Sequence, residues 1–185
     1  MFDTLNAPAK KASPMMIVGM LAAFAVILVW AVPALLSGDF RWFVAGASAQ
    51  PQRLSIWADG HETTLVPSDR DYPAISQAAT EAITHIYGLS EYGPSVQTID
   101  EYRQSFALEV FYAEPLQIHS RFNLGHPRHV MVPLTGTGYK EGRFFIGSDG
   151  SYWAAGPRTH GDEAVRAAVN TALNGRGILI PADRP

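Results

Sequence analysis

The chain has 185 residues, of which 47% are apolar and 17% charged, and its formal net charge is −3. This length suffices for one globular domain and a short additional segment. After residue 49 there remain 11 Lys/Arg and 15 Asp/Glu, and this acidic balance argues against nucleic-acid binding, which needs a basic face. The lack of cysteine excludes a disulfide framework, a thiolate zinc site and a thiol nucleophile.

An apolar run follows a short N-terminal tail (residues 1–14). Met15–Leu36 comprises 22 residues without a charged side chain. As a helix rising about 1.5 Å per residue, it can cross a hydrocarbon core of about 30 Å. Phe40, Trp42 and Phe43 come next, where aromatic rings settle between lipid headgroups and tails. The sequence predicts a single transmembrane helix, with the lipid bilayer as the partner of Met15–Leu36.

A cleaved secretory signal is the alternative interpretation of the same segment. Lys10 and Lys11 supply a basic start, and the small residues around Ala49 resemble a cleavage site. However, the apolar run is longer than the usual core of a signal peptide, which has about 7–15 residues. A further 13 residues separate the run from Ala49. We therefore expect an uncleaved anchor, with secretion after cleavage near Ala49 as the alternative.

The orientation of the anchor depends on nearby positive charge. Lys10 and Lys11 precede the apolar run, and Arg41 and Arg53 follow it, so the count is equal on the two sides. The adjacent lysines and the short N-terminal tail favour a cytoplasmic N-terminus in the cell membrane. The domain is then expected outside the cytoplasm.

Residues 37–52 are rich in small and polar residues and are expected to form a tether to a globular domain at 53–180. The domain opens with a hairpin pattern around Asp59-Gly60. A helix is expected over residues 69–88, ending at Gly88, and the Thr98–Glu101 spacing predicts a helix start. Residues 135–142 are expected to form a flexible hairpin loop.

The second half of the domain is rich in alternating strand patterns. Strands are expected at 105–113, 116–122, 129–136 and 143–148, and a turn at Asp149-Gly150 leads into another. A final helix covers residues 159–175. The order is ββα-βββββ-α, which predicts an α+β domain with a mostly antiparallel sheet and two helices on one face.

Three histidines fall within the stretch from His119 to Val130. His119, His126 and His129 suggest a three-nitrogen metal site of the catalytic zinc type. Gly125 and Pro127 exclude a helix here, so His119 and His129 are expected on two paired strands with His126 at the loop between them. Solvent-facing histidines are the favoured interpretation, and whether His119 faces His129 across the hairpin is left open.

Four arginines in the strand-rich half are candidates for binding an anion, namely Arg121, Arg128, Arg143 and Arg158. Arginine stems that cover an open sheet face are the simpler explanation. Glu109 lies in the middle of a predicted strand. It is expected to face water, since a buried glutamate would need a partner such as an arginine. The consecutive aromatic pairs Phe144-Phe145 and Tyr152-Trp153 predict either coverage of both sheet faces or an exposed aromatic patch.

No cofactor and no catalytic residue follows from these patterns, and no motif favours an enzyme over a binding protein. The anchor and the two-sided aromatic strands favour a single-pass membrane protein whose domain contacts another protein, as an accessory subunit. A membrane-anchored domain that binds a small anion or a peptide through its arginines is the alternative. A hydrolase or metal enzyme built on the three histidines ranks third.

Overall fold

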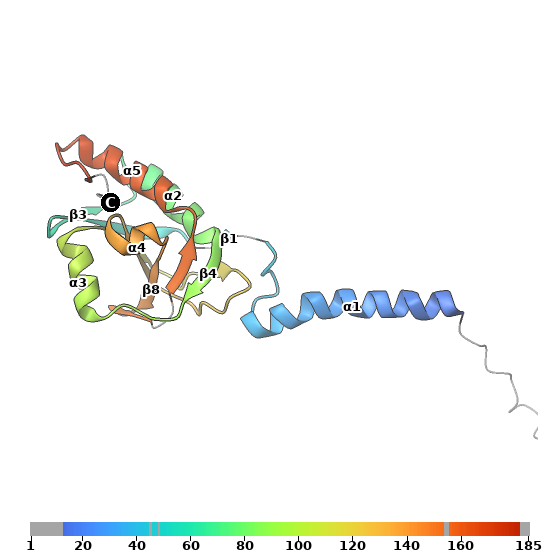
Figure 1. Cartoon of the computed structure of the whole chain (residues 1–185). Helices are drawn as coiled ribbons and strands as arrows, with labels where there is room; N and C mark the ends of the chain where they lie inside the picture. Colours follow the sequence, from blue (N-terminus) through green and yellow to red (C-terminus); the bar gives the residue numbers. More distant parts are fainter. Residues whose placement is uncertain (1–12, 45, 48, 154–155, 182–185) are drawn as a thin grey trace, which may run out of the picture.

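The computed structural model describes residues 13–44, 46–47, 49–153 and 156–181. A long N-terminal helix precedes a domain in which helices pack on a mostly antiparallel sheet (Figure 1). The α+β class and the N-terminal apolar helix expected from the sequence are confirmed.

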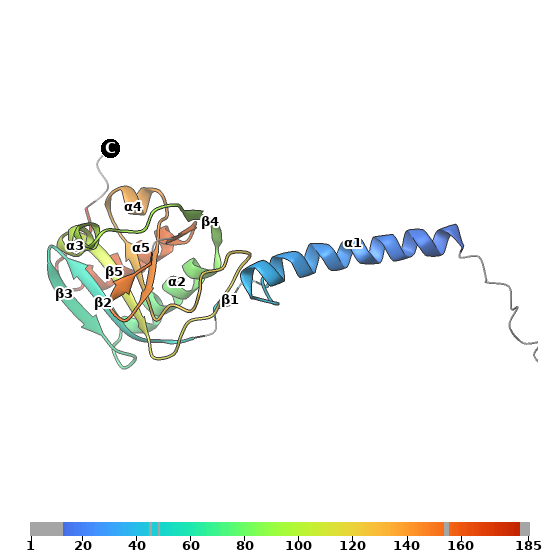
Figure 2. The ribbon, with the colours of Figure 1, turned by 90° about the horizontal axis from the view of Figure 1, so that it is seen from below.

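Helix α1 (Pro14–Ser37) extends away from the domain as a separate rod (Figure 2). It has 24 residues with a mean hydropathy of 2.7 in its most apolar stretch, none of which is buried in the protein. It is long and apolar enough to cross a membrane, a property it shares with N-terminal signal sequences. The helix ends at Gly38, whose φ of 69° is the left-handed conformation that glycine adopts without steric cost.

The central sheet has six strands in the order β3-β2-β5-β7-β8-β9, and all neighbours are antiparallel. The strands are β2 (Pro51–Ala58), β3 (His61–Leu65), β5 (Phe106–Tyr112), β7 (His129–Pro133), β8 (Phe145–Ser148) and β9 (Ser151–Tyr152). The turns at Asp59-Gly60 and Asp149-Gly150 have positive φ at every residue, as the Asp-Gly dipeptides predict.

Two helices, α2 (Tyr72–Thr84) and α5 (Asp162–Asn174), lie side by side on one face of this sheet (Figure 1). Their apolar residues recur at three- and four-residue spacing and face inward. The fully buried members of this main core include Leu54, Ile56, Ile75, Ile83, Leu108, Val110, Leu173 and Ile146. Burying each such side chain contributes about 1.5–3 kcal/mol to folding, before the loss of chain entropy is counted.

The opposite face of the sheet is partly covered by helix α3 (Val96–Gln104). A second, smaller core forms there from Ile99, Ala107, Met131 and Phe145. Phe144 and Phe145 point to opposite faces, yet they are 1% and 3% exposed. The aromatic side chains on this part of the sheet are therefore covered on both faces rather than exposed as a patch.

Two short ribbons complete the domain. Strand β1 (Gly46–Ala47) pairs with β6 (Ile118–His119), and β4 (Ile86–Ser90) pairs with β10 (Gly156–Thr159). The expected helix over 69–88 therefore ends earlier, at Thr84. Gly88 is a strand residue rather than a helix cap, because pairing with β10 satisfies the backbone of this segment.

Three other local expectations are corrected. The strand predicted over 116–122 has only the two residues of β6, and it pairs with β1 rather than with β7. Helix α3 is capped by Ser95, whose Oγ accepts the Thr98 amide at 3.0 Å, so Thr98 does not itself cap it. The loop expected over 135–142 contains the short helix α4 (Gly136–Lys140), where the Gly138 amide donates to the Tyr102 hydroxyl at 3.1 Å.

Candidate functional site

Glu109 is buried on the face of the sheet that α3 covers. Alternation along β5 places Leu108 and Val110 toward α2 and α5, and turns Glu109 toward α3. Its cross-strand neighbours are Ser55 on β2 and Met131 on β7. Glu109 is 2% exposed, so the expectation that it faces water is wrong.

Three donors surround the Glu109 carboxylate. Arg103 from α3 donates to Oε1 at 2.7 Å, and the Tyr152 hydroxyl from β9 donates to the same oxygen at 2.5 Å. The Trp57 indole N–H from β2 donates to Oε2 at 2.9 Å. A buried carboxylate is tolerated only when paired and hydrogen-bonded, and here three elements, α3, β9 and β2, supply the partners. We call Glu109, Arg103, Trp57 and Tyr152 the Glu109 cluster.

The protonation states in this cluster follow from burial and from the nearby charges. Burial, followed by the neighbouring Glu109 carboxylate, raises the pKa of Tyr152 well above its usual value, so its hydroxyl keeps the proton that it donates. Burial alone would lower the pKa of Arg103, but the hydrogen bond and charge of Glu109 outweigh it, and the pKa is raised. The cluster thus contains an ion pair between Glu109 and Arg103 that ties α3 to the sheet, and the Tyr152 hydroxyl links the edge strand β9 to β5.

His129 lies beside this cluster in a row that crosses five strands. The register places Arg53, Phe111, His129, Gly147 and Tyr152 side by side on β2, β5, β7, β8 and β9. The imidazole meets the Tyr152 ring edge-on, with 4.6 Å between ring centroids. Gly147 leaves room for it, since a Cβ there would lie 2.8 Å from the His129 Nε2 atom.

The His129 side chain is 4% exposed, and burial lowers its pKa from the usual value. The negative charges of Glu109 and Asp149 oppose this shift, while Arg103 adds to it. A neutral imidazole offers one N–H donor and one acceptor nitrogen. In the described part of the chain, neither ring nitrogen of His129 has a hydrogen-bond partner within the protein.

The three predicted histidines separate into two places. His119 and His126 line a cavity of about 250 Å³ at the junction between α1 and the domain, whereas His129 lines a different cavity. Because His119 is on β6 and His129 is on β7, they do not face each other across a hairpin. Among the described residues, no group of three histidine or acidic side chains is placed to hold a metal ion.

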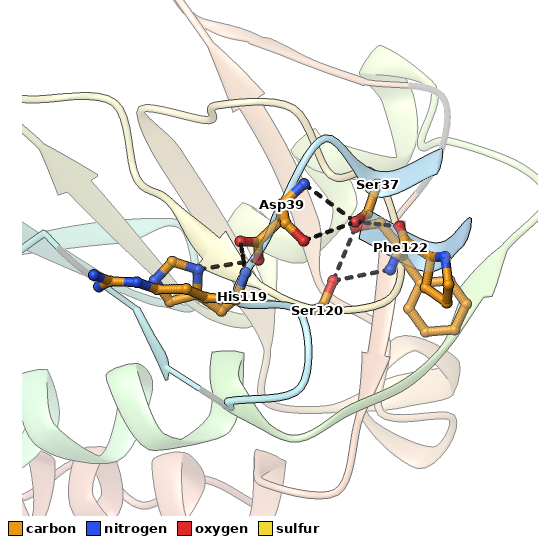
Figure 3. A network of polar contacts seen from close by, with 7 residues as sticks. Ser37, Asp39, His119, Ser120 and Phe122 are labelled. Atoms are coloured by element: carbon orange, nitrogen blue, oxygen red, sulfur yellow. Dashed lines mark hydrogen bonds and ion pairs between the residues drawn. The ribbon is translucent and has the colours of Figure 1, made fainter. Parts of the chain in front are cut away.

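Asp39 is the partner of His119 at this junction. The Nδ1 atom of His119 lies 3.0 Å from the Asp39 Oδ2 atom, although the two residues are 80 positions apart (Figure 3). The backbone N–H of Asp39 donates a hydrogen bond to the Ser37 hydroxyl oxygen at 3.2 Å. The segment that follows α1 is thus joined to the domain by a polar contact between side chains.

The four candidate arginines do not form a single group in the structure. Arg143 and Arg158 form an isolated antiparallel bridge, and both pair with the Glu141 carboxylate. Arg121 donates to the Tyr87 carbonyl at 3.0 Å, and Arg128 donates to the Ala113 carbonyl at 2.9 Å. Of the four, Arg128 lines the cavity next to His129.

Sequence patterns overlooked the Glu109 cluster. Tyr152 lies 43 residues after Glu109, and Trp57 lies 52 residues before it. Alternation along a strand reveals which residues share a face, but not what covers that face. The available signal was a glutamate in an otherwise apolar strand, which implies a buried partner if both faces are covered.

Comparison with protein-family models, with curated proteins and with solved structures finds no match to this chain.

Proposed function

We propose that the chain is a single-pass membrane-anchored protein whose domain acts outside the cytoplasm as an accessory subunit that contacts another protein of the same membrane. The observation that carries this proposal is the packing of the segment after α1 onto the domain. Asp39 pairs with His119, and β1 pairs with β6. The anchor is in this way continuous with the folded domain.

This packing favours retention of the anchor over cleavage near Ala49. Cleavage there would remove β1 and leave His119 without its carboxylate partner. It would also remove Ala47 and Ala49, which are both partly buried against the main core. A signal peptide is normally dispensable to the mature fold, whereas this segment contributes a strand and an ion pair to the domain, which supports retention.

The chain also turns back onto the end of the helix. The Trp42 indole donates to the Trp30 carbonyl at 3.2 Å, and the Phe40 and Trp30 rings lie 5.9 Å apart. Aromatic rings at the end of a spanning helix settle at headgroup depth. A domain attached through such a short, packed connection stays close to the bilayer surface, which favours a partner in the same membrane.

Apolar exposure on the domain gives a candidate contact surface. Val96, the first residue of α3, is 80% exposed, and Tyr92, four residues before it, is 78% exposed. Large apolar side chains that are this exposed are candidates for contact with another protein. We therefore place the partner contact at this end of α3.

Site-specific photo-crosslinking in native membranes tests this function. A photoreactive amino acid at Tyr92 should give one discrete adduct with a membrane protein. The same group at Thr171, which is exposed on α5 on the opposite face of the sheet, should not. Absence of an adduct from position 92, or equal adducts from both positions, would count against the proposal.

A further inference from the structure

A cavity of about 500 Å³ opens next to His129, at the end of the row that crosses the sheet. Its lining combines basic, apolar and acidic side chains. The lining includes Arg53, Val66, Phe111, Arg128, His129 and Asp149. This cavity is separate from the one at the junction with α1.

Two guanidinium groups at the cavity lack a carboxylate partner. In the part of the chain that the structure describes, neither Arg53 nor Arg128 forms an ion pair. Arg53 lies over the Phe111 ring, 4.0 Å from its centroid, and one Arg128 nitrogen is engaged by the Ala113 carbonyl. Each guanidinium has five N–H donors, so most of them remain available to a ligand.

The other lining residues narrow the kind of ligand. The buried His129 imidazole can donate one hydrogen bond at the base of the cavity. Val66 and Phe111 offer apolar surface beside the arginines. The Asp149 carboxylate, which accepts a hydrogen bond from Ser148 at 3.1 Å, disfavours a ligand with two negative charges.

We propose that this cavity binds a small organic carboxylate, with Arg53 and Arg128 on the carboxylate oxygens, His129 donating to it and Phe111 contacting the carbon skeleton. Guanidinium groups match the planar carboxylate and form the stronger, charge-assisted hydrogen bonds. This proposal concerns a site that the accessory-subunit function does not require, and each can fail without the other.

Calorimetric titration of the full chain in uncharged detergent tests the site, with benzoate and inorganic phosphate as the two probes. Benzoate should bind saturably with a Kd of about 1 mM or tighter, and more tightly than phosphate. Arg53→Gln and Arg128→Gln should each weaken benzoate about tenfold, the loss of one charge-assisted hydrogen bond. Arg176→Gln, an exposed arginine beyond α5, should leave affinity unchanged.

A further variant is expected to bind benzoate more tightly, and a gain in affinity cannot be explained by misfolding. Asp149→Asn should tighten benzoate binding, because a negative charge at the cavity is removed. No saturation at about 10 mM benzoate, or an equal loss in Arg176→Gln, would overturn the proposal. Tighter binding of phosphate than of benzoate would overturn the carboxylate assignment.

The pH dependence gives a second readout for His129. A bound anion favours the charged imidazole, so benzoate affinity should rise as pH falls from about 7.5 to 5.5, and this trend should vanish in His129→Gln. The charged groups around His129 are Glu109 and Arg103 on one side, and Arg53, Arg128 and Asp149 at the cavity. An unchanged pH trend in the variant would remove His129 from the site.

Discussion

At the residue scale, Glu109 has the largest expected effect on stability. Its carboxylate neutralises Arg103 and accepts the hydrogen bonds of Tyr152 and Trp57. Glu109→Gln keeps the size but removes the charge, which leaves Arg103 without its buried counterion. We expect the free energy of unfolding to fall by about 3 kcal/mol, as for other buried pairs that lose one partner.

Urea denaturation of the full chain in detergent measures this loss. Glu62→Gln is the matched control, because Glu62 is exposed on the edge strand β3, and we expect a change of less than about 0.5 kcal/mol. Equal stability of the two variants would show that the Glu109 cluster does not stabilise the packing of α3 on the sheet.

His129 makes stability depend on pH at the same scale. Its pKa is lowered in the folded protein, so below the usual pKa of about 6.5 the unfolded chain binds the proton that the folded chain excludes. The stability that His129 contributes is complete above that pKa and is lost as pH falls toward its folded value. Wild type should lose more stability than His129→Gln between pH 7.5 and 5.5, up to about 1.4 kcal/mol for each unit of pKa shift. Parallel pH profiles would contradict this.

At the element scale, the packing of β7 against β8 depends on Gly147. A Cβ at this position would clash with the Ser151 carbonyl and approach the His129 ring nitrogen at 2.8 Å. Gly147→Ala should therefore destabilise the protein by about 2 kcal/mol or more. Gly88→Ala is the control on β4, where a Cβ meets nothing within 4 Å. Thermal denaturation of both variants is the measurement, and a tolerated Gly147→Ala would refute the close approach.

Sequence patterns predicted the turns and helices that are determined by residues close together in the chain. The Asp-Gly dipeptides gave the turn positions because few other residues adopt two successive positive φ values. The spacing of Ile75, Ala79 and Ile83 gave the inward face of α2. Gly88 was misassigned because a glycine after a helical pattern suits a cap as well as a strand, and pairing with the distant β10 decides between them.

The Glu109 cluster was not predicted for the same reason, because the contacts that form it join residues distant in the chain. Alternation in β5 put Glu109 opposite Leu108 and Val110, but it could not show that α3 covers the second face. His119 was expected to pair with the β7 side of a hairpin, whereas its strand pairs with β1, about 70 residues earlier in the chain. Contacts of such long sequence separation leave no periodic signal.

At the scale of the whole molecule, the lack of cysteine makes the orientation directly measurable. A single cysteine at Thr171 on α5 should react with a membrane-impermeant maleimide in intact cells, because the domain is proposed to lie outside the cytoplasm. A cysteine at Thr4 in the N-terminal tail should react only after lysis. The reverse pattern would mean the opposite orientation.

The central claim is that α1 remains attached as a membrane anchor whose connection is part of the domain. Asp39 with His119 and β1 with β6 are the contacts on which it depends. Mass spectrometry of the natural protein, after alkaline carbonate washing of membranes, tests the claim most directly. We predict that the chain stays in the membrane fraction and yields peptides covering Met15–Leu36. A soluble chain that begins at Gln50 would contradict it.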